Sequence, residues 1–330
     1  MRLGLALDLG SAAPVAGQVS AALPLLRTAA EAGVDGVWVG ESYHRRPEPF
    51  HLPAALVVLA HLAALTPLRL GTGVLLLRAY DPARLAYETA LVDQLVEGRL
   101  TVGLGLGPAE LGDRFGCGDR PGAALLDGTL RELRAAWADG VVPGPFGHAG
   151  SGGPAGSGGP AGSGGPAGSG GPAGSGGPAG SGGPRILVGG GTAASVRRAV
   201  ELADGYYAAT NYTDRLLARQ AAAYRERATG DVVVNRLCLV HPDGDTARDL
   251  AARHLAPVLD YYTGRGLWKS TRDDQEPAVP ALVGTPAEVG DALRRYADLG
   301  VTTVNLRVAP YGTPPEVARR SIELAASTQT

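Results

Sequence analysis

Residues 68–107 constrain the fold of this chain more than any other stretch, because two apolar runs flank one helical pattern. The first run, LRLGTGVLLL, is almost continuously apolar and predicts a strand buried on both faces, as in a parallel sheet. Asp81 and Pro82 then occupy the N-cap and first position of a predicted helix, and LTVGLGLG at 100–107 predicts a second buried strand. Since strand, helix and strand in this order form a right-handed crossover in nearly all proteins, an α/β architecture is expected.

Further apolar runs predict six more strands that alternate with helical patterns. The runs lie at residues 2–9, 36–41, 185–191, 204–210, 232–241 and 301–310, and the helical patterns at 19–32, 52–64, 123–137, 195–203, 214–228 and 315–326. The first 110 residues alone fit either an open doubly wound sheet or half of a closed barrel. Eight strands match a (β/α)₈ TIM barrel, so residues 1–330 are predicted to form a single barrel domain of about 250 residues plus insertions.

Two insertions interrupt this pattern. AGSGGP occurs six times without change at residues 149–184, between the helix predicted at 123–137 and the fifth strand. Glycine at every third position satisfies the collagen rule, but alternate triplets lack proline and three chains would be needed. A disordered, polyproline-leaning loop is therefore the favoured interpretation. Residues 243–283 combine a helical pattern at 246–260 with YYTGRGLWKSTRDDQEP, which we interpret as a lid over the barrel.

Charge and cysteine content exclude several classes of partner. A formal net charge of −2 provides no electrostatic attraction for nucleic acid or for an anionic membrane. Cys117 and Cys238 are far apart and have neither CxxC nor metal-ligand spacing, so free thiols and no metal site are expected. The N-terminus begins at once as a strand and has no signal-peptide pattern. These features lead us to expect a cytoplasmic protein that acts on a small molecule.

Candidate site residues follow the strands at their carboxyl ends, where barrel enzymes place their active sites. Glycines stand at three of these ends, and the GGGT turn at 189–192 opens a helix whose free amides suit a phosphate. Because no GxGxxG follows the first strand, a planar phosphorylated cofactor there fits a flavin better than a dinucleotide. The predicted cofactor-binding residues are Asp8, Thr72, Gly73, Val74, Gly105, Gly107, Gly189, Gly190, Gly191 and Thr192.

Two residues after the second strand are candidates for proton transfer. Glu41 ends an apolar strand and is expected at the inner rim of the barrel, and His44 follows three residues later. Each has a simpler interpretation, Glu41 as the ion-pair partner of Arg45, Arg46 or Arg78 and His44 as a solvated loop residue. Asp8 has a simpler interpretation as well, as a loop cap.

Six segments of the chain form a recognisable family pattern. They are GVDGVWVGES, LGTGV, DRFG, RILVGGG, GTPAEVGDALRRYADLGVTTVNLRV and, most specifically, DPARLAYETALVDQLVEGRLTVGLGLG with Pro82, Leu85, Ala86, Asp93, Leu95, Gly98 and Arg99 at the family's spacing. With these segments the chain resembles the bacterial luciferase-like superfamily of flavin-dependent oxidoreductases nearly throughout, outside the repeats. The resemblance implies a (β/α)₈ barrel, often a homodimer, that binds reduced FMN or its 5-deazaflavin analogue. It also implies a non-prolyl cis peptide bond near Gly73 and Val74.

The resemblance implies a function as well. The first hypothesis is a monooxygenase that uses reduced FMN and oxygen on a small organic substrate, with a separate flavin reductase as partner. The alternatives are an oxygen-independent hydride transfer with the deazaflavin coenzyme F420 and a non-catalytic flavin-binding barrel. Three departures leave the subclass open, one of which is Pro108, which stands where deazaflavin-dependent sugar-phosphate dehydrogenases place an acidic residue, with Glu110 nearby. Leu106 stands where FMN enzymes of this kind place a phosphate-binding arginine, and His44 lies later than the histidines of many members.

Overall fold

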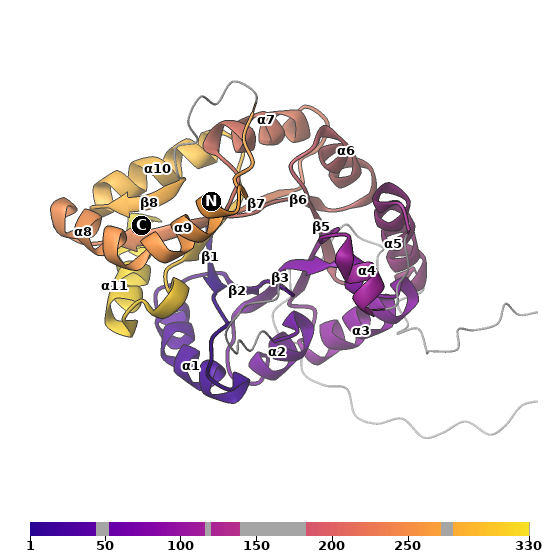
Figure 1. Cartoon of the computed structure of the whole chain (residues 1–330), viewed down its shortest axis with the longest axis horizontal. Coiled ribbons are helices and arrows are strands. Elements are labelled where there is room, and N and C mark those ends of the chain that lie inside the picture. Colours follow the sequence, from indigo (N-terminus) through magenta and orange to yellow (C-terminus); the bar gives the residue numbers. More distant parts are fainter. Residues whose placement is uncertain (44–52, 116–119, 139–182, 272–279, 330) are drawn as a thin grey trace, which may run out of the picture.

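The computed structural model describes residues 1–43, 53–115, 120–138, 183–271 and 280–329. Its parallel strands form a closed ring in the order β6-β5-β4-β3-β2-β1-β9-β7, which β6 closes by pairing with β7. Helices surround this ring on the outside (Figure 1), so the predicted TIM barrel is confirmed. The barrel strands are β1 (Arg2–Leu7), β2 (Gly36–Val39), β3 (Arg69–Leu76), β4 (Leu100–Gly105), β5 (Arg185–Gly189), β6 (Gly205–Ala208), β7 (Asp231–Val240) and β9 (Thr303–Arg307).

The helices follow the strands as the periodic pattern predicts, although α1 begins earlier and α2 is shorter than expected. They are α1 (Val15–Glu31), α2 (Ala55–Leu62), α3 (Pro82–Leu95), α4 (Glu110–Phe115), α5 (Gly122–Trp137), α6 (Ala193–Leu202), α7 (Asp214–Arg225), α8 (Gly244–His254), α9 (Ala256–Gly264), α10 (Pro286–Asp298) and α11 (Pro315–Ala326). Within the part of the chain that the structure describes, no helix has the length and apolar character needed to cross a membrane.

The β3–α3–β4 unit has the predicted structure. Asp81 caps α3 by accepting a hydrogen bond from the Arg84 amide at 3.0 Å, and a proline occupies the first turn. The side chains that α3 buries are Leu85, Ala86, Thr89, Ala90 and Val92. Leu91 and Leu95 belong to the same apolar pattern, but they are 39% and 63% exposed. The helix therefore presents an outer apolar face that the barrel does not cover.

Arg99, at the end of the most specific motif, joins α2, α3 and β3 at the start of β4. Its guanidinium group donates to the backbone carbonyls of Ala63, Thr66, Leu68 and Val96 at 2.8–3.3 Å. An arginine suits this place because its planar group offers five donors in a fixed arrangement. Arg99 thus has a structural role, and it lies at the opposite end of β4 from the expected site.

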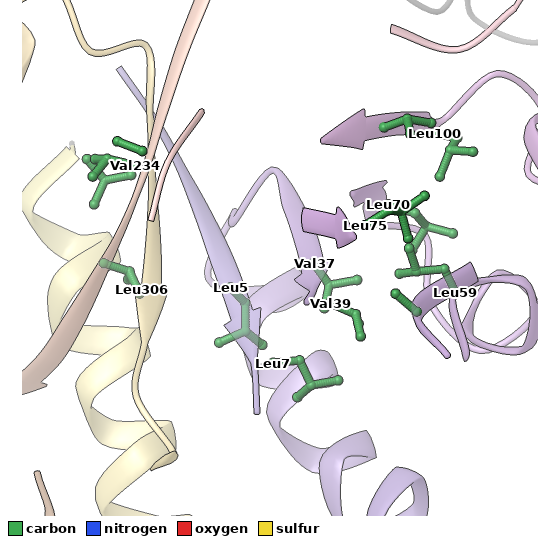
Figure 2. Packing of buried hydrophobic residues seen from close by; sticks show 14 of the residues in the cluster. Leu5, Leu7, Val37, Val39, Leu59, Leu70, Leu75, Leu100, Val234 and Leu306 are labelled. Atoms are coloured by element: carbon green, nitrogen blue, oxygen red, sulfur yellow. The ribbon is translucent and has the colours of Figure 1, made fainter. Parts of the chain in front are cut away.

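Two apolar layers stabilise the barrel, because alternate side chains of a strand point to opposite faces. The outer layer lies between strands and helices and includes Leu5, Leu7, Val37, Val39 and Leu70 (Figure 2). The inner layer fills the barrel itself with Trp38, Leu187, Tyr207 and Val233. Cys238 is buried with a free thiol, as predicted, whereas Cys117 lies outside the described residues.

The two insertions are described to different extents. The repeat at 149–184 lies almost entirely outside the described residues, so its disorder stays a prediction. The segment at 243–283 contains α8, α9 and a short strand, β8 (Ala281–Gly284), which the sequence pattern did not predict. β8 pairs with the end of β7, outside the closed ring. So short a run carries too little periodicity to be distinguished from a loop.

Candidate active site

The carboxyl ends of β3, β4 and β5 lie next to one another at one mouth of the barrel. Leu76 of β3 is in register with Gly105 of β4, and Leu104 of β4 with Val188 of β5. The structure thereby brings together the predicted cofactor residues that follow or end these strands. The peptide bond between Gly73 and Val74 is cis, as the family resemblance implied.

Gly73 lies against a tyrosine of another barrel strand. A Cβ atom on Gly73 would overlap the hydroxyl of Tyr207 on β6 and lie 3.0 Å from its Cζ atom. Tyr207 is buried, donates to Asn235 Oδ1 at 2.7 Å, and packs near Trp38 with 5.7 Å between ring centroids. Burial raises the pKa of the Tyr207 hydroxyl well above its ordinary value, so the group remains a donor. Glycine is thus required at position 73 by the protein's own tyrosine, and not only by an approaching ligand.

Val74 occupies the space that neighbouring glycines leave free. Cβ atoms on Gly103, Gly105 and Gly189 would lie 3.2, 2.9 and 3.5 Å from the Val74 side chain, which is itself only partly buried. Thr72, by contrast, is fully buried and exchanges two hydrogen bonds with the Gly103 backbone at 2.8 and 2.9 Å. Among these third-strand residues, Val74 therefore offers the accessible side chain, and Thr72 fixes β3 against β4.

Gly107 turns the chain after β4. Its φ angle of +75° is one that glycine adopts without strain, and a Cβ atom there would lie 3.0 Å from Leu76 and 3.2 Å from Leu111. The close packing around Gly107 places the start of α4 beside the end of β3.

Glu41 is held by groups from three segments of the chain. Its Oε2 atom accepts the Leu76 amide at 3.1 Å, and its Oε1 atom accepts the Ala55 amide at 3.3 Å and the Tyr80 hydroxyl. The Glu41 amide also donates to the Val74 carbonyl at 3.2 Å. Arg78, one of the arginines considered as its partner, donates instead to the Arg120 carbonyl at 3.3 Å. Glu41 therefore clamps the end of β3 through hydrogen bonds.

The surroundings of Glu41 favour its protonated form. Burial raises the pKa of the Glu41 carboxyl above its usual value, and the hydrogen bonds from Tyr80, Leu76 and Ala55 oppose this shift only in part. Burial, followed by the charge of Glu41, raises the pKa of Tyr43 to about 12. The same two causes raise the pKa of Tyr80. A carboxyl group with a raised pKa and two protonated tyrosines thus lie beside the β3 end, whereas His44 lies outside the described residues.

Asp8 is paired with an arginine at the barrel rim. Arg307 at the end of β9 donates to Asp8 through Nε and Nη2 at 2.7–2.9 Å, a bidentate pair. Its Nη1 atom donates to the Tyr262 hydroxyl of α9 at 2.9 Å. The pair therefore ties β1 to β9 and anchors the α9 helix of the predicted lid to the rim.

The turn at 189–192 is the predicted phosphate seat, and it opens α6. Gly190 has a φ angle of +147°, and a Cβ atom there would overlap the Ser195 hydroxyl, so only glycine fits. Thr192 caps α6, accepting the Ser195 amide at 3.2 Å and lying 3.0 Å from the Ser195 hydroxyl. The amides of the first helical turn and the positive end of the helix dipole suit an anion at this point.

The chain's single lysine, Lys269, lies beside this turn. A Cβ atom on Gly191 would lie 3.2 Å from the Lys269 Cδ atom, and the ammonium group is 5.5 Å from the centroid of the Tyr212 ring. The Lys269 backbone is fixed by hydrogen bonds with Asn211 and Thr213 at 2.8 and 3.0 Å. A positive side chain from the 243–283 insertion therefore joins the α6 N-terminus.

Sequence reasoning missed four residues of this region that the fold brings in: Tyr207, Tyr80, Arg307 and Lys269. For Arg307 a signal existed, since the alternation of apolar and polar residues in VNLRV places Asn305 and Arg307 on one face of the strand. DGYYAAT does not alternate, so it does not assign Tyr207 to a face. Tyr80 and Lys269 lie in irregular segments, so no periodicity could assign them to the site.

Comparison with solved structures shows the same fold throughout. A monooxygenase, RslO1, from Streptomyces bottropensis shares 23% identity with a TM-score of 0.71 over 99% of this chain and 98% of that one. The oxygenating constituent of 3,6-diketocamphane monooxygenase from Pseudomonas putida, in complex with FMN, shares 19% with a TM-score of 0.68, over 99% and 97% of the two chains. The coenzyme F420 dependent tetrahydromethanopterin reductase from Methanopyrus kandleri shares 16% with a TM-score of 0.63, over 99% and 97%.

Sequence comparison identifies the family. An uncharacterized protein, y4vJ, from Sinorhizobium fredii is 40% identical over 88 residues, which is 26% of this chain and 24% of that protein, so the match spans about a quarter of each. The model of the family described as luciferase-like monooxygenase matches residues 1–303. That match includes every candidate site residue predicted from the sequence, and the chain belongs to the luciferase-like monooxygenase family of flavin-dependent oxidoreductases.

Proposed function

We propose that this protein is a monooxygenase that uses reduced FMN and oxygen to oxygenate a small organic substrate. The observation that carries the proposal is the turn at 189–192, where helix amides, the Thr192 and Ser195 hydroxyls and the Lys269 side chain converge beside the end of β3. A phosphate has three acceptor oxygens and a charge near −2, so this donor set fits it. Two of the structures compared above, RslO1 and the oxygenating constituent of 3,6-diketocamphane monooxygenase, belong to monooxygenases, and the second is in complex with FMN.

The residues of the turn fit the cofactor phosphate even though Leu106 replaces the expected arginine. Lys269 offers a positive charge on the other side of the seat, from the 243–283 insertion. Gly189, Gly190 and Gly191 leave the backbone accessible, and Thr192 and Ser195 provide hydroxyls. Val74, the accessible side chain of the cis peptide at the β3 end, would contact the cofactor ring.

Reduced flavin supplies the electrons that activate oxygen, and the protein's own groups control protons and water around it. The apolar side chains of the inner barrel layer exclude water below the site. We propose that Glu41 holds a proton at the β3 end, because burial raises its pKa and Tyr80 orients it. The α9 helix, anchored by Tyr262 to Arg307 and Asp8, covers the mouth as a lid.

Hydride transfer with the deazaflavin coenzyme F420 is the second candidate. The same phosphate seat serves either cofactor, and the F420 dependent reductase has the same fold. The missing arginine at Leu106 favours this alternative, since it is the FMN enzymes that place an arginine there. A non-catalytic flavin-binding barrel is the third possibility.

A titration separates these candidates. The purified protein is titrated anaerobically with reduced FMN and with reduced coenzyme F420, followed by absorbance, and air is then admitted. Tight binding of reduced FMN with rapid oxygen consumption supports the monooxygenase. Binding of coenzyme F420 without oxygen consumption supports hydride transfer, and FMN binding without any turnover of electrons supports the non-catalytic barrel.

Replacing Lys269 by glutamine is expected to weaken FMN binding roughly ten- to a hundredfold, because one charge-assisted contact to the phosphate is lost. Riboflavin, which lacks the phosphate, should bind the variant and the wild type equally. Isothermal titration with both ligands measures the difference, and Arg265→Gln, a nearby exposed change, is the matched control. Equal losses for FMN and riboflavin would mean that Lys269 does not meet the phosphate.

A homodimer is the assembly we propose, with a separate flavin reductase as the source of reduced FMN. The support is the exposed apolar surface of two adjacent helices, with Val57 of α2 71% exposed and Leu95 of α3 63% exposed. Side chains of this size are seldom left uncovered together.

Leu95→Glu is expected to convert such a dimer into monomers while leaving the melting temperature of the monomer nearly unchanged, since Leu95 is mostly exposed. Light scattering coupled to gel filtration measures the mass. The control is Arg27→Glu on the exposed side of α1. An unchanged mass for Leu95→Glu would remove α3 from the interface.

A further inference from the structure

A small cavity of about 30 Å³ lies at the opposite mouth of the barrel, among the amino ends of the strands. Trp38 and Leu187 of the inner layer form its roof, and Arg2, Arg69 and Arg185 extend around it from β1, β3 and β5. Nothing in the proposed flavin chemistry uses this end of the barrel.

One aspartate at the cavity is fully occupied by two of these arginines. Arg2 Nη2 pairs with Asp231 Oδ1 at 2.5 Å, and Arg185 Nη2 pairs with Asp231 Oδ2 at 2.7 Å. The Thr302 hydroxyl adds a third hydrogen bond to Oδ1 at 3.0 Å. Asp231 therefore has little capacity to accept further donors.

Within the described ranges, two arginine groups at the cavity have no paired acceptor. The Nε atom of Arg185 is buried and has no hydrogen-bond partner there. The Arg69 guanidinium forms no ion pair within 4 Å among these residues, although Asp35 also lines the cavity. The three arginines and two aspartates of the lining leave one positive charge on the cavity wall, which Asp93 near Arg69 offsets only from outside the lining. The cavity thus combines a buried donor, a net positive charge and room for a particle the size of one or two water molecules.

We propose that this cavity binds a small inorganic anion, with chloride as the physiological probe. An anion accepts hydrogen bonds from every direction and donates none. It can therefore accept a hydrogen bond from the Arg185 Nε atom and at the same time compensate the positive charge of Arg69. A water molecule would accept from these groups but would leave the positive charge uncompensated. Bound there, the anion would hold the amino ends of β3 and β5 together and stabilise the closed barrel.

Crystals grown with bromide in place of chloride give the direct test. An anomalous peak in the cavity, within hydrogen-bonding distance of Arg185 Nε and near Arg69, is the expected result. Density there without an anomalous signal identifies water and overturns the proposal, as does an empty cavity.

Thermal unfolding of the flavin-free protein gives the energetic test, so its outcome does not depend on the proposed activity. At constant ionic strength, replacing methanesulfonate by chloride should raise the melting temperature roughly 2–4 °C for each tenfold increase above the dissociation constant. Arg69→Gln should abolish this chloride dependence, and Arg27→Gln on α1 should retain it. Equal responses of the two variants, or none in the wild type, overturn the proposal.

Discussion

Replacing Gly73 by valine is expected to abolish flavin binding and to destabilise the flavin-free barrel. The Cβ atom would overlap the buried Tyr207 hydroxyl, and the branched side chain would extend into the region that the cofactor ring occupies in the proposed site. Overpacking of a well-filled interior costs about 1–3 kcal/mol and occasionally more. Urea unfolding measures the loss of stability, and a titration with reduced FMN measures the loss of binding.

The smaller change Gly73→Ala permits a rescue that identifies the cause. Tyr207→Phe removes the overlapping hydroxyl, so Gly73→Ala combined with Tyr207→Phe should be more stable than the sum of the two single effects predicts, by about 1 kcal/mol or more. Tyr207→Phe alone should destabilise by about 1–3 kcal/mol, because Asn235 loses its donor.

Gly128→Ala is the matched control for these variants. It lies on α5, where a Cβ atom would have nothing within 4 Å, and it should be neutral or slightly stabilising. Strict additivity of the two changes at Gly73 and Tyr207 would show that the tyrosine is not what makes glycine necessary.

The fold was predictable because its main determinants are local. LRLGTGVLLL and LTVGLGLG are apolar on both faces, as strands in a helix-covered parallel barrel must be, and Asp81 followed by proline marks the start of α3. The number of strand–helix units then leaves few possible topologies, because the connections between parallel strands are right-handed in nearly all proteins. The prediction failed at β8, whose four residues carry no periodic signal.

The places of the candidate residues in the fold were predictable, but the side chains that they contact were not. Strand ends could be read from the sequence, so the positions of Gly73, Gly105 and Glu41 followed directly. The sequence did not indicate which side chain fills the space beside each glycine. Tyr207, for example, lies more than a hundred residues from Gly73 along the chain and contacts it only in the closed barrel. The glycines were therefore attributed to a ligand, whereas Trp38, Val74 and Tyr207 take up most of the room.

The partners of the Glu41 carboxyl could not be predicted from the sequence either. Its neighbours in sequence suggested an ion pair with an arginine, but its carboxylate instead accepts two backbone amides and the Tyr80 hydroxyl. No cation pairs with Glu41 among the described residues, and burial raises the pKa of its carboxyl. The direction of this shift depends on neighbours in three dimensions, and it favours retention of the proton to a higher pH than in an exposed glutamate.

The raised pKa of Glu41 has a measurable effect on stability. The folded state binds this proton more tightly than the unfolded state, so the stabilisation is fully present below a pH of about 4.5 and is lost as the pH rises through the folded pKa. Glu41→Gln cannot titrate. The stability of the wild type relative to this variant should therefore be greatest in acid and should decrease as the pH rises. A difference that does not vary with pH would show that Glu41 has an ordinary pKa.

The effect of Glu41→Gln on kcat is expected to be larger than its effect on stability. If Glu41 supplies a proton to the reaction, Glu41→Gln should lower kcat on the order of 10²-fold, while FMN affinity changes little because the phosphate seat is separate. Wild-type kcat should fall as the pH rises through the folded pKa. Tyr80→Phe removes a hydrogen bond that lowers this pKa, so it should move the fall in kcat to higher pH while the carboxyl group remains.

These variants also distinguish proton transfer from positioning. A Glu41 that only clamps β3 predicts a fall in FMN affinity and in stability for Glu41→Gln, with no shift of the pH profile in Tyr80→Phe. His44→Ala is the remaining comparison and is expected to have the smaller effect on kcat, because His44 is displaced along the chain from the strand end. If His44→Ala abolishes turnover and Glu41→Gln leaves it normal, His44 and not Glu41 is the proton donor. Glu41 would then only support the end of β3.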